Sequence, residues 1–269
     1  MRNVRAKIVY DGSLFFGWQR QDGFASVQEA VEEALAGLVG DPVTVHGAGR
    51  TDTGVHSLGQ VASFHVDTRL ADDRLRHAIN AHLPEGVVIE RLETCRDDFH
   101  ARFDAAGKRY LYVTATSRFR PPLGMQYAHW ISDPLNLDAM RQAARDIVGE
   151  HDFRAFSNVG SPRKTTVRTV KRLRLVPRRR VFAFVVQADG FLYNMVRTIA
   201  GTLIDVGRGR LSPDCVREAL AAGDRDLIGP TAPARGLYLL STLYREDVFA
   251  GPDVGPRGRA GAFPLRDAF

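Results

Sequence analysis

The chain has 269 residues, of which 44% are hydrophobic, so it can form one large domain or two small ones with a buried core. Its formal net charge of +6 favours an acidic partner such as nucleic acid. Two cysteines without metal-ligand spacing exclude a disulfide scaffold and a zinc site. No apolar run approaches the ~20 residues of a spanning helix, and none follows the N-terminus as in a signal peptide. We expect a cytoplasmic protein without a metal or a membrane contact.

Residues 1–105 are predicted to form the first half of the molecule. Alternating apolar positions predict a strand over residues 4–10, and Ser26 with Glu29 forms a capping box for a helix that ends at Gly40. Further strands are expected over 43–48, 60–66 and 87–94, and a second helix over 72–82. The order strand–helix–strand–strand–helix–strand is the ferredoxin-like arrangement.

Residues 106–247 repeat that order loosely, without a sequence repeat. The expected strands cover residues 108–115, 165–176, 181–188 and 236–244, and the expected helices cover 137–148, 194–206 and 213–222. We predict an α+β protein of two ferredoxin-like halves. They form one long mixed, largely antiparallel sheet, with helices on one face and a central active-site cleft. Residues 248–269 are rich in Gly, Pro and Arg and are predicted to be a flexible tail.

The loop of residues 47–56, Gly-Ala-Gly-Arg-Thr-Asp-Thr-Gly-Val-His, carries one carboxylate, Asp52, among glycines and hydroxyl residues. A lone carboxylate in this setting is a candidate nucleophile or general base, and Arg50 shares its side if the backbone is extended. Asp-Thr-Gly is also a common turn. A phosphate-binding loop is excluded, because Val55 and His56 stand where Lys and Ser/Thr are required. An aspartic protease would need a dimer across this single loop.

Residues 163–180 contain nine lysines and arginines and no Asp or Glu. Such a run is either a solvated strand face or a surface that grips an acidic partner. Within it, Arg172 and Arg174 are candidate RNA contacts, on a strand that Pro177 interrupts.

The ten-residue loop as a whole resembles the signature of the TruA family of tRNA pseudouridine synthases, in which the aspartate matching Asp52 is catalytic. Residues 108–112, Lys-Arg-Tyr-Leu-Tyr, resemble the second motif of that family. There the tyrosine matching Tyr110 lies against the target uracil. As bare sequence, a strand tyrosine is most often a packing residue, although an aromatic beside basic residues also stacks on an extruded base.

Residues 190–197, Gly-Phe-Leu-Tyr-Asn-Met-Val-Arg, resemble the third motif, whose arginine, matching Arg197, pairs with the catalytic aspartate. Asn194 and Thr198 stand where that family commonly has histidine and asparagine. Residues 10–12, 17–21 and 231–238 are similar to further stretches of the family, and the last of these places Leu237 in an apolar wall of the pocket.

The resemblance implies a cofactor-free isomerase that acts on uridines 38–40 in the anticodon stem-loop of tRNA, as a homodimer. Asp52 would attack in its ionised form, Tyr110 would stack on the uracil and manage the proton at carbon five, and Arg197 would pair with Asp52. Arg50 would hold the phosphate of the extruded nucleotide or fill its place in the helix. Two other hypotheses stay open on the residues alone, a non-catalytic RNA-binding module and a dimeric aspartic protease.

Overall fold

The computed structural model describes residues 1–157, 165–178, 180–246 and 248–249, in two compact units. Unit 1 comprises Met1–Ala106 with the end of the chain from Thr242, and unit 2 comprises Gly107–Ser241. Arg163, Lys164 and Arg179 of the basic run, and the expected tail beyond residue 249, lie outside the described residues. Within the described ranges, no helix is both long enough and apolar enough to cross a membrane.

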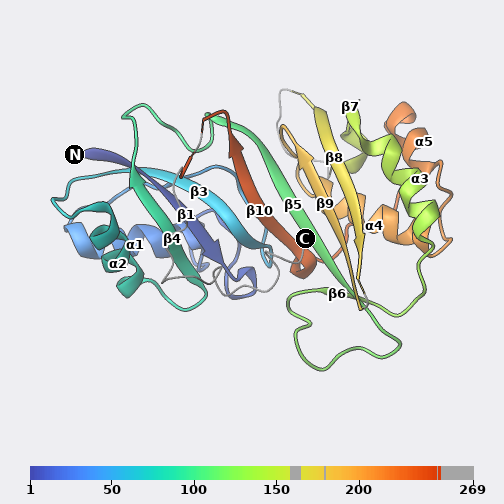
Figure 1. Ribbon diagram of the computed structural model, residues 1–269, viewed down its shortest axis with the longest axis horizontal. Coiled ribbons are helices and arrows are strands. Elements are labelled where there is room, and N and C mark those ends of the chain that lie inside the picture. Colours follow the sequence, from blue (N-terminus) through green and yellow to red (C-terminus); the bar gives the residue numbers. More distant parts are fainter. Residues whose placement is uncertain (158–164, 179, 247, 250–269) are drawn as a thin grey trace. The chain divides into compact units, whose positions relative to one another are not determined.

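Unit 1 has the order of elements predicted for it (Figure 1). Its elements are β1 (Arg2–Tyr10), α1 (Val27–Val39), β2 (His46–Gly47), β3 (His56–Val66), α2 (Asp72–His82) and β4 (Val87–Thr94). The antiparallel pairs β1–β4, β1–β3 and β2–β3 give the strand order β4-β1-β3-β2. β2 is far shorter than the strand expected over 43–48. Its predecessor Val45 bonds instead to α1, because its N–H donates to Glu32 Oε1 (3.0 Å) and its carbonyl accepts from Gln28 Nε2 (3.2 Å).

One core lies beneath both helices of unit 1. α1 begins at Ser26, whose hydroxyl accepts from the N–H of Glu29 at 3.2 Å, and it ends at Gly40 in the left-handed conformation, as predicted. Alternate residues of β1 are buried and share a cluster with Leu35 of α1 and Ile79 of α2. Because side chains alternate across a strand, α1 and α2 cover the same face of these strands.

Unit 2 is built on a second set of strands, of which β5 begins and β10 ends with residues of unit 1. Its elements are β5 (Ala105–Thr116), β6 (His129–Ile131), α3 (Leu137–Ile147), β7 (Gly149–Asp152), β8 (Val167–Pro177), β9 (Val181–Ala188), α4 (Met195–Gly207), α5 (Cys215–Ala222) and β10 (Leu237–Tyr244). The strand order is β10-β5-β9-β8-β7, and β6 pairs parallel with β5 while β8 and β9 pair antiparallel. The α+β class with a mixed sheet is therefore confirmed. β6 and β7 were not predicted, since three and four residues are too short to show a period.

Candidate active site

The Asp52 loop connects β2 to β3 in unit 1 and contains a tight turn. The N–H of Val55 donates to the carbonyl of Asp52 at 3.1 Å, and Gly54 within the turn has a φ of 79°. That conformation is open to glycine at no steric cost. Asp52 itself is half-buried, so the turn leaves this residue partly accessible to solvent.

Four hydrogen bonds that involve backbone atoms of the loop or the Thr51 hydroxyl help to fix it to the elements around it. They are Ala48 N to Val61 O (2.8 Å), Gln60 Nε2 to Gly49 O (2.6 Å), Trp18 N to Thr51 O (3.1 Å) and the Tyr10 hydroxyl with the Thr51 hydroxyl (2.8 Å). Burial raises the pKa of Tyr10, so its hydroxyl stays neutral as a hydrogen-bonding partner. Backbone atoms and Thr51 thus hold the loop in place around the side chain of Asp52.

The segment that follows β1 packs directly against the Asp52 loop. At Gly17, with a φ of 90°, a Cβ atom would lie 2.6 Å from the carbonyl oxygen of Thr51. No side chain fits there without moving the loop backbone. The same segment also contacts Arg50, because Gln19 Oε1 accepts a hydrogen bond from Arg50 Nε at 3.0 Å. The side chain of Arg50 is therefore exposed, but this hydrogen bond restrains its Nε.

Three polar residues hold this loop, and sequence reasoning assigned no role to two of them, Gln19 and Gln60. The third is His56, whose buried ring has its Nδ1 3.1 Å from both the Gly12 nitrogen and Asp11 Oδ1. His56 and Gln60 form hydrogen bonds with backbone atoms, and Gln19 forms one with the side chain of Arg50. A sequence pattern gives no signal for such contacts, because they join residues 11 to 44 positions apart.

Tyr110 lies on β5 of unit 2 and is 7% exposed. Its ring meets Phe191 edge-on, with centroids 5.1 Å apart and an interplanar angle of 88°. Its strand neighbour Tyr112 is also buried, and the Tyr112 hydroxyl donates to the carbonyl of Pro233 at 2.9 Å. Burial raises the pKa of Tyr112, although the positive charges of Arg197 and Arg235 oppose the rise. Tyr112 is thus a neutral anchor of the fold.

Arg197 stands in the first turn of α4 and is half-buried. Its Nε donates to the carbonyl of Ala232 at 2.7 Å, and its Nη1 donates to Asn194 Oδ1 at 2.8 Å. Asn194 adopts a φ of 61°, which asparagine tolerates better than most residues. The asparagine at the position where the TruA family commonly has histidine therefore supplies an acceptor to this arginine.

Unit 2 brings the second, third and last sequence motifs together. The Thr198 hydroxyl of α4 lies 3.3 Å from that of Thr231, and the segment from Thr231 leads into β10. Leu237, the first residue of β10, is 6% exposed. Arg197, Leu237 and the two tyrosines thus belong to one packed region. The predicted pair of Arg197 with Asp52 joins residues of different units and stays a prediction.

Arg172 and Arg174 are both exposed on β8. A bulge between Val170 and Arg172 resets the register, which pairs Arg172 with Gln187 of β9. Tyr110 pairs with Val186, and consecutive strand residues point to opposite faces. The two arginines therefore stand on the face of the unit 2 sheet opposite to Tyr110, a separation that the sequence did not indicate.

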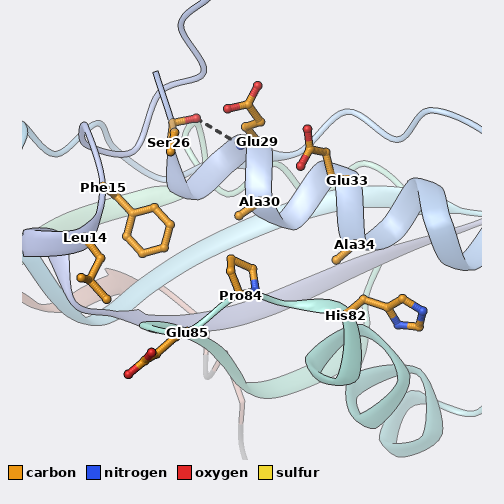
Figure 2. A pocket seen from close by; sticks show the side chains of 11 residues that line it. Leu14, Phe15, Ser26, Glu29, Ala30, Glu33, Ala34, His82, Pro84 and Glu85 are labelled. Carbon is orange, nitrogen blue, oxygen red and sulfur yellow. Dashed lines mark hydrogen bonds between the residues drawn. The ribbon is translucent and has the colours of Figure 1, made fainter. Parts of the chain in front are cut away.

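A hollow of about 510 Å³ opens elsewhere in unit 1 (Figure 2). Phe15, Ala30 and Pro84 line it, while the carboxylates of Glu29 and Glu33 point away from Pro84. No residue of the Asp52 loop lines it. Glu29, Glu33 and Glu85 give this hollow an acidic rim, which disfavours phosphate.

Nothing in the described ranges gathers three or more His, Cys, Asp or Glu side chains around a possible metal position. The features above are those of an α+β enzyme in which one carboxylate on a fixed loop is the candidate nucleophile, with a buried tyrosine and a half-buried arginine as candidate partners.

Comparison with known proteins shows which enzyme family has these features. The family described as tRNA pseudouridine synthase matches residues 6–104 and 143–245. A protein named tRNA pseudouridine synthase A from Acetivibrio thermocellus is 43% identical over 91% of this chain and 100% of its own length. Proteins of that name from Thermoanaerobacter sp. and Syntrophotalea carbinolica are 42% and 44% identical, each over 91% of this chain and over 100% and 97% of their own lengths.

Among solved structures, the archaeal box H/ACA sRNP Nop10–Cbf5 complex has a TM-score of 0.36 and 11% identity, over 87% of this chain and 60% of that chain. A likeness this low bears on neither fold nor function. The sequence matches suffice by themselves: the chain belongs to the tRNA pseudouridine synthase family. The predicted resemblance is confirmed, and the chain is an isomerase of this class rather than a non-catalytic RNA-binding module or a protease.

Proposed function

We propose that this enzyme converts uridines 38, 39 and 40 in the anticodon stem-loop of tRNA to pseudouridine. The observation that carries the proposal is the Asp52 loop, which matches the family signature and presents one carboxylate on a backbone fixed by four hydrogen bonds. The reaction breaks the bond from N1 to the ribose and forms one from carbon five. Carbon five loses a proton and N1 gains one, so neither a redox cofactor nor a metal is required.

Asp52 is proposed as the nucleophile, and it must be ionised to attack. An aspartate has an ordinary pKa of about 3.9, and enclosure by RNA would raise it. A guanidinium nearby opposes that rise, which is the role proposed for Arg197. Its Nε and Nη1 are held by Ala232 and Asn194, so the charge is oriented before substrate arrives.

Tyr110 is proposed to stack on the extruded uracil and to manage the proton that leaves carbon five. The edge-on contact with Phe191 keeps its ring in one orientation, which favours both roles. Leu237 is proposed to close the pocket with an apolar wall, which excludes water from the detached uracil.

Arg50 is proposed to hold the phosphate of the extruded nucleotide or to fill the vacated place in the helix. Its tether to Gln19 leaves the rest of the guanidinium available. Arg172 and Arg174 are proposed to grip the stem at a distance from the uracil, since they stand on the face opposite to Tyr110. We further propose that the enzyme is a homodimer in the cytoplasm.

Release of tritium from uridine labelled at carbon five tests this function. An unmodified tRNA transcript with uridine at position 38, 39 or 40 should release it, and a transcript with cytidine at all three should not. Release from both transcripts would place the target elsewhere. Release from neither would refute the proposed reaction.

A further inference from the structure

Phe16 and Phe24 form an exposed aromatic pair beside the Asp52 loop. Their ring centroids are 4.8 Å apart, and each residue is 48% exposed. Exposed apolar side chains that gather on a surface make that surface a candidate contact for a partner. Neither residue has a role in the motifs described above.

The backbone directs Phe16 away from the acid-rimmed hollow. Phe15 has an extended conformation, with φ −133° and ψ 150°, so consecutive side chains leave opposite sides of the chain. Phe15 lines the hollow, as Figure 2 shows, and only 6% of it is exposed, so Phe16 points away from the hollow. The pair is thus separated from the carboxylates that would repel a nucleic acid.

The loop that carries the pair is closed on itself. The N–H of Phe16 donates to the carbonyl of Ala25 at 2.9 Å, and Gln21 bridges to Phe24. Both rings are therefore placed before a ligand binds, which lowers the entropy cost of stacking.

This loop is fastened to the proposed catalytic loop. Trp18 N donates to Thr51 O at 3.1 Å, and a Cβ at Gly17 would lie 3.2 Å from the carbonyl carbon of Asp52. Phe16 is the next residue along the chain, with its Cα about 3.8 Å from that of Gly17. The aromatic pair consequently lies within about one or two nucleotide lengths of Asp52 along any RNA strand that reaches that carboxylate.

We propose that Phe16 and Phe24 form a stacking platform for an unpaired nucleobase next to the target uridine. This inference rests on the proposed function. The occupant is a base of the substrate RNA, because the chain carries a net charge of +6 and the tethered Arg50 lies on the neighbouring loop. Base stacking on aromatic side chains tolerates every base, so the platform serves different tRNAs alike.

The test compares the double variant Phe16→Ser with Phe24→Ser against Phe16→Tyr with Phe24→Tyr, which keeps both rings. Both are placed in an Asp52→Asn background, so that binding of an unmodified tRNA transcript is measured without turnover. We expect the serine variant to raise Kd roughly 5- to 150-fold and the tyrosine variant to leave it within about twofold. Phe119→Ser, which removes an aromatic side chain 76% exposed in unit 2, is the matched control and should bind normally.

The melting temperature of each variant separates loss of the platform from loss of fold. An unchanged Kd for the folded serine variant would overturn the proposal. So would a change in oligomeric state that accounts for the weaker binding, since the pair would then be a protein interface. Tritium release by the enzyme with Asp52 intact is measured in parallel. If that enzyme is active and the serine variant binds normally, the platform alone is wrong; if it is inactive, the proposed function has failed.

Discussion

The Asp52 loop of unit 1 and the Arg197 region of unit 2 carry proposed catalytic residues, and they differ in where their hydrogen bonds fall. Around Asp52, four fixing hydrogen bonds fall on backbone atoms and on Thr51. Around Arg197, hydrogen bonds to Ala232 and Asn194 fall on the functional side chain itself. A change of the Asp52 side chain therefore leaves these backbone and Thr51 contacts in place, whereas a change of Arg197 removes hydrogen bonds that join α4 to the segment before β10.

The largest effect is expected from Asp52→Asn. The amide is a poor nucleophile, so single-turnover tritium release should fall at least about 100-fold. Because asparagine has nearly the size and shape of aspartate and the loop keeps its bonds to backbone atoms and Thr51, the melting temperature and the Kd for tRNA should stay nearly unchanged. Asp41→Asn, at an exposed position of the same unit, is the control. Residual activity above a hundredth of the original rate would exclude Asp52 as nucleophile.

Two substitutions distinguish the two roles proposed for Tyr110. Tyr110→Phe keeps the ring and removes the hydroxyl, so turnover should fall roughly 10²- to 10⁴-fold while tRNA binding is retained. Tyr110→Leu removes the ring as well and should weaken binding. It should also lower the melting temperature, since Phe191 then has no aromatic ring to pack against at this position. Wild-type single-turnover kinetics for the phenylalanine variant would rule out the proton role.

Arg197→Met should impair both activity and stability, in contrast to Asp52→Asn. Loss of the two hydrogen bonds leaves the carbonyl of Ala232 without the guanidinium donor, at a cost of about 1–3 kcal/mol. Removal of the guanidinium should raise the pKa of Asp52, so less of it is ionised and activity falls most at the acidic end of the profile. An acidic limb identical to that of the unchanged enzyme would argue against the ion pair.

Arg172 and Arg174 should affect binding alone. Replacing both with Gln should make the slope of the logarithm of the binding constant against the logarithm of salt concentration less steep. The expected change is roughly 0.7 to 0.9 for each phosphate that an arginine neutralises. The rate of the bound complex should not change, because these residues face away from Tyr110. Arg141→Gln on α3 is the matched control, and an unchanged slope would show that β8 does not touch the RNA.

Burial of His129 should make the free energy of unfolding of unit 2 depend on pH. Burial, followed by the charges of Arg235 and Arg208, lowers the pKa of His129 from 6.5 to about 4. Between these values the unfolded chain binds more protons than the folded one, so the free energy of unfolding decreases as pH falls from about 6.5 to 4. His129→Phe, which keeps an aromatic ring beside Tyr112, should flatten that decrease in a titration by chemical denaturation. A profile as steep as before would contradict this origin.

The sequence predicted most elements of the fold, and the reason is periodicity. The bounds of α2, β4 and β9 agree with those expected, since each has a full period and clear end signals. The strand predicted over residues 43–48 is too long, because side chains of α1 bond the backbone of Val45 instead. The bulge after Val170 was not predicted, because one extra residue in a strand leaves no signal in composition. In both cases the outcome depends on contacts with other elements.

The sequence offered candidate site residues only where motifs carry them. Asp52, Tyr110 and Arg197 were proposed from strings of neighbouring residues, each confined to one segment, and their roles stay predictions. The contacts that hold these residues were not predicted. Gln60 donates to the carbonyl of Gly49, and Asn194, with a φ of 61°, accepts a hydrogen bond from Arg197. These contacts depend on backbone geometry, for which the sequence has no direct signal.

The central claim is that the carboxylate of unit 1 and the guanidinium of unit 2 serve one chemical step. A double-mutant cycle of Asp52→Glu and Arg197→Lys, read by single-turnover tritium release, tests it most directly. If both groups act in that step, the double variant should retain at least about tenfold more activity than the product of the two single losses predicts. A double variant whose loss equals that product within about twofold would contradict the account.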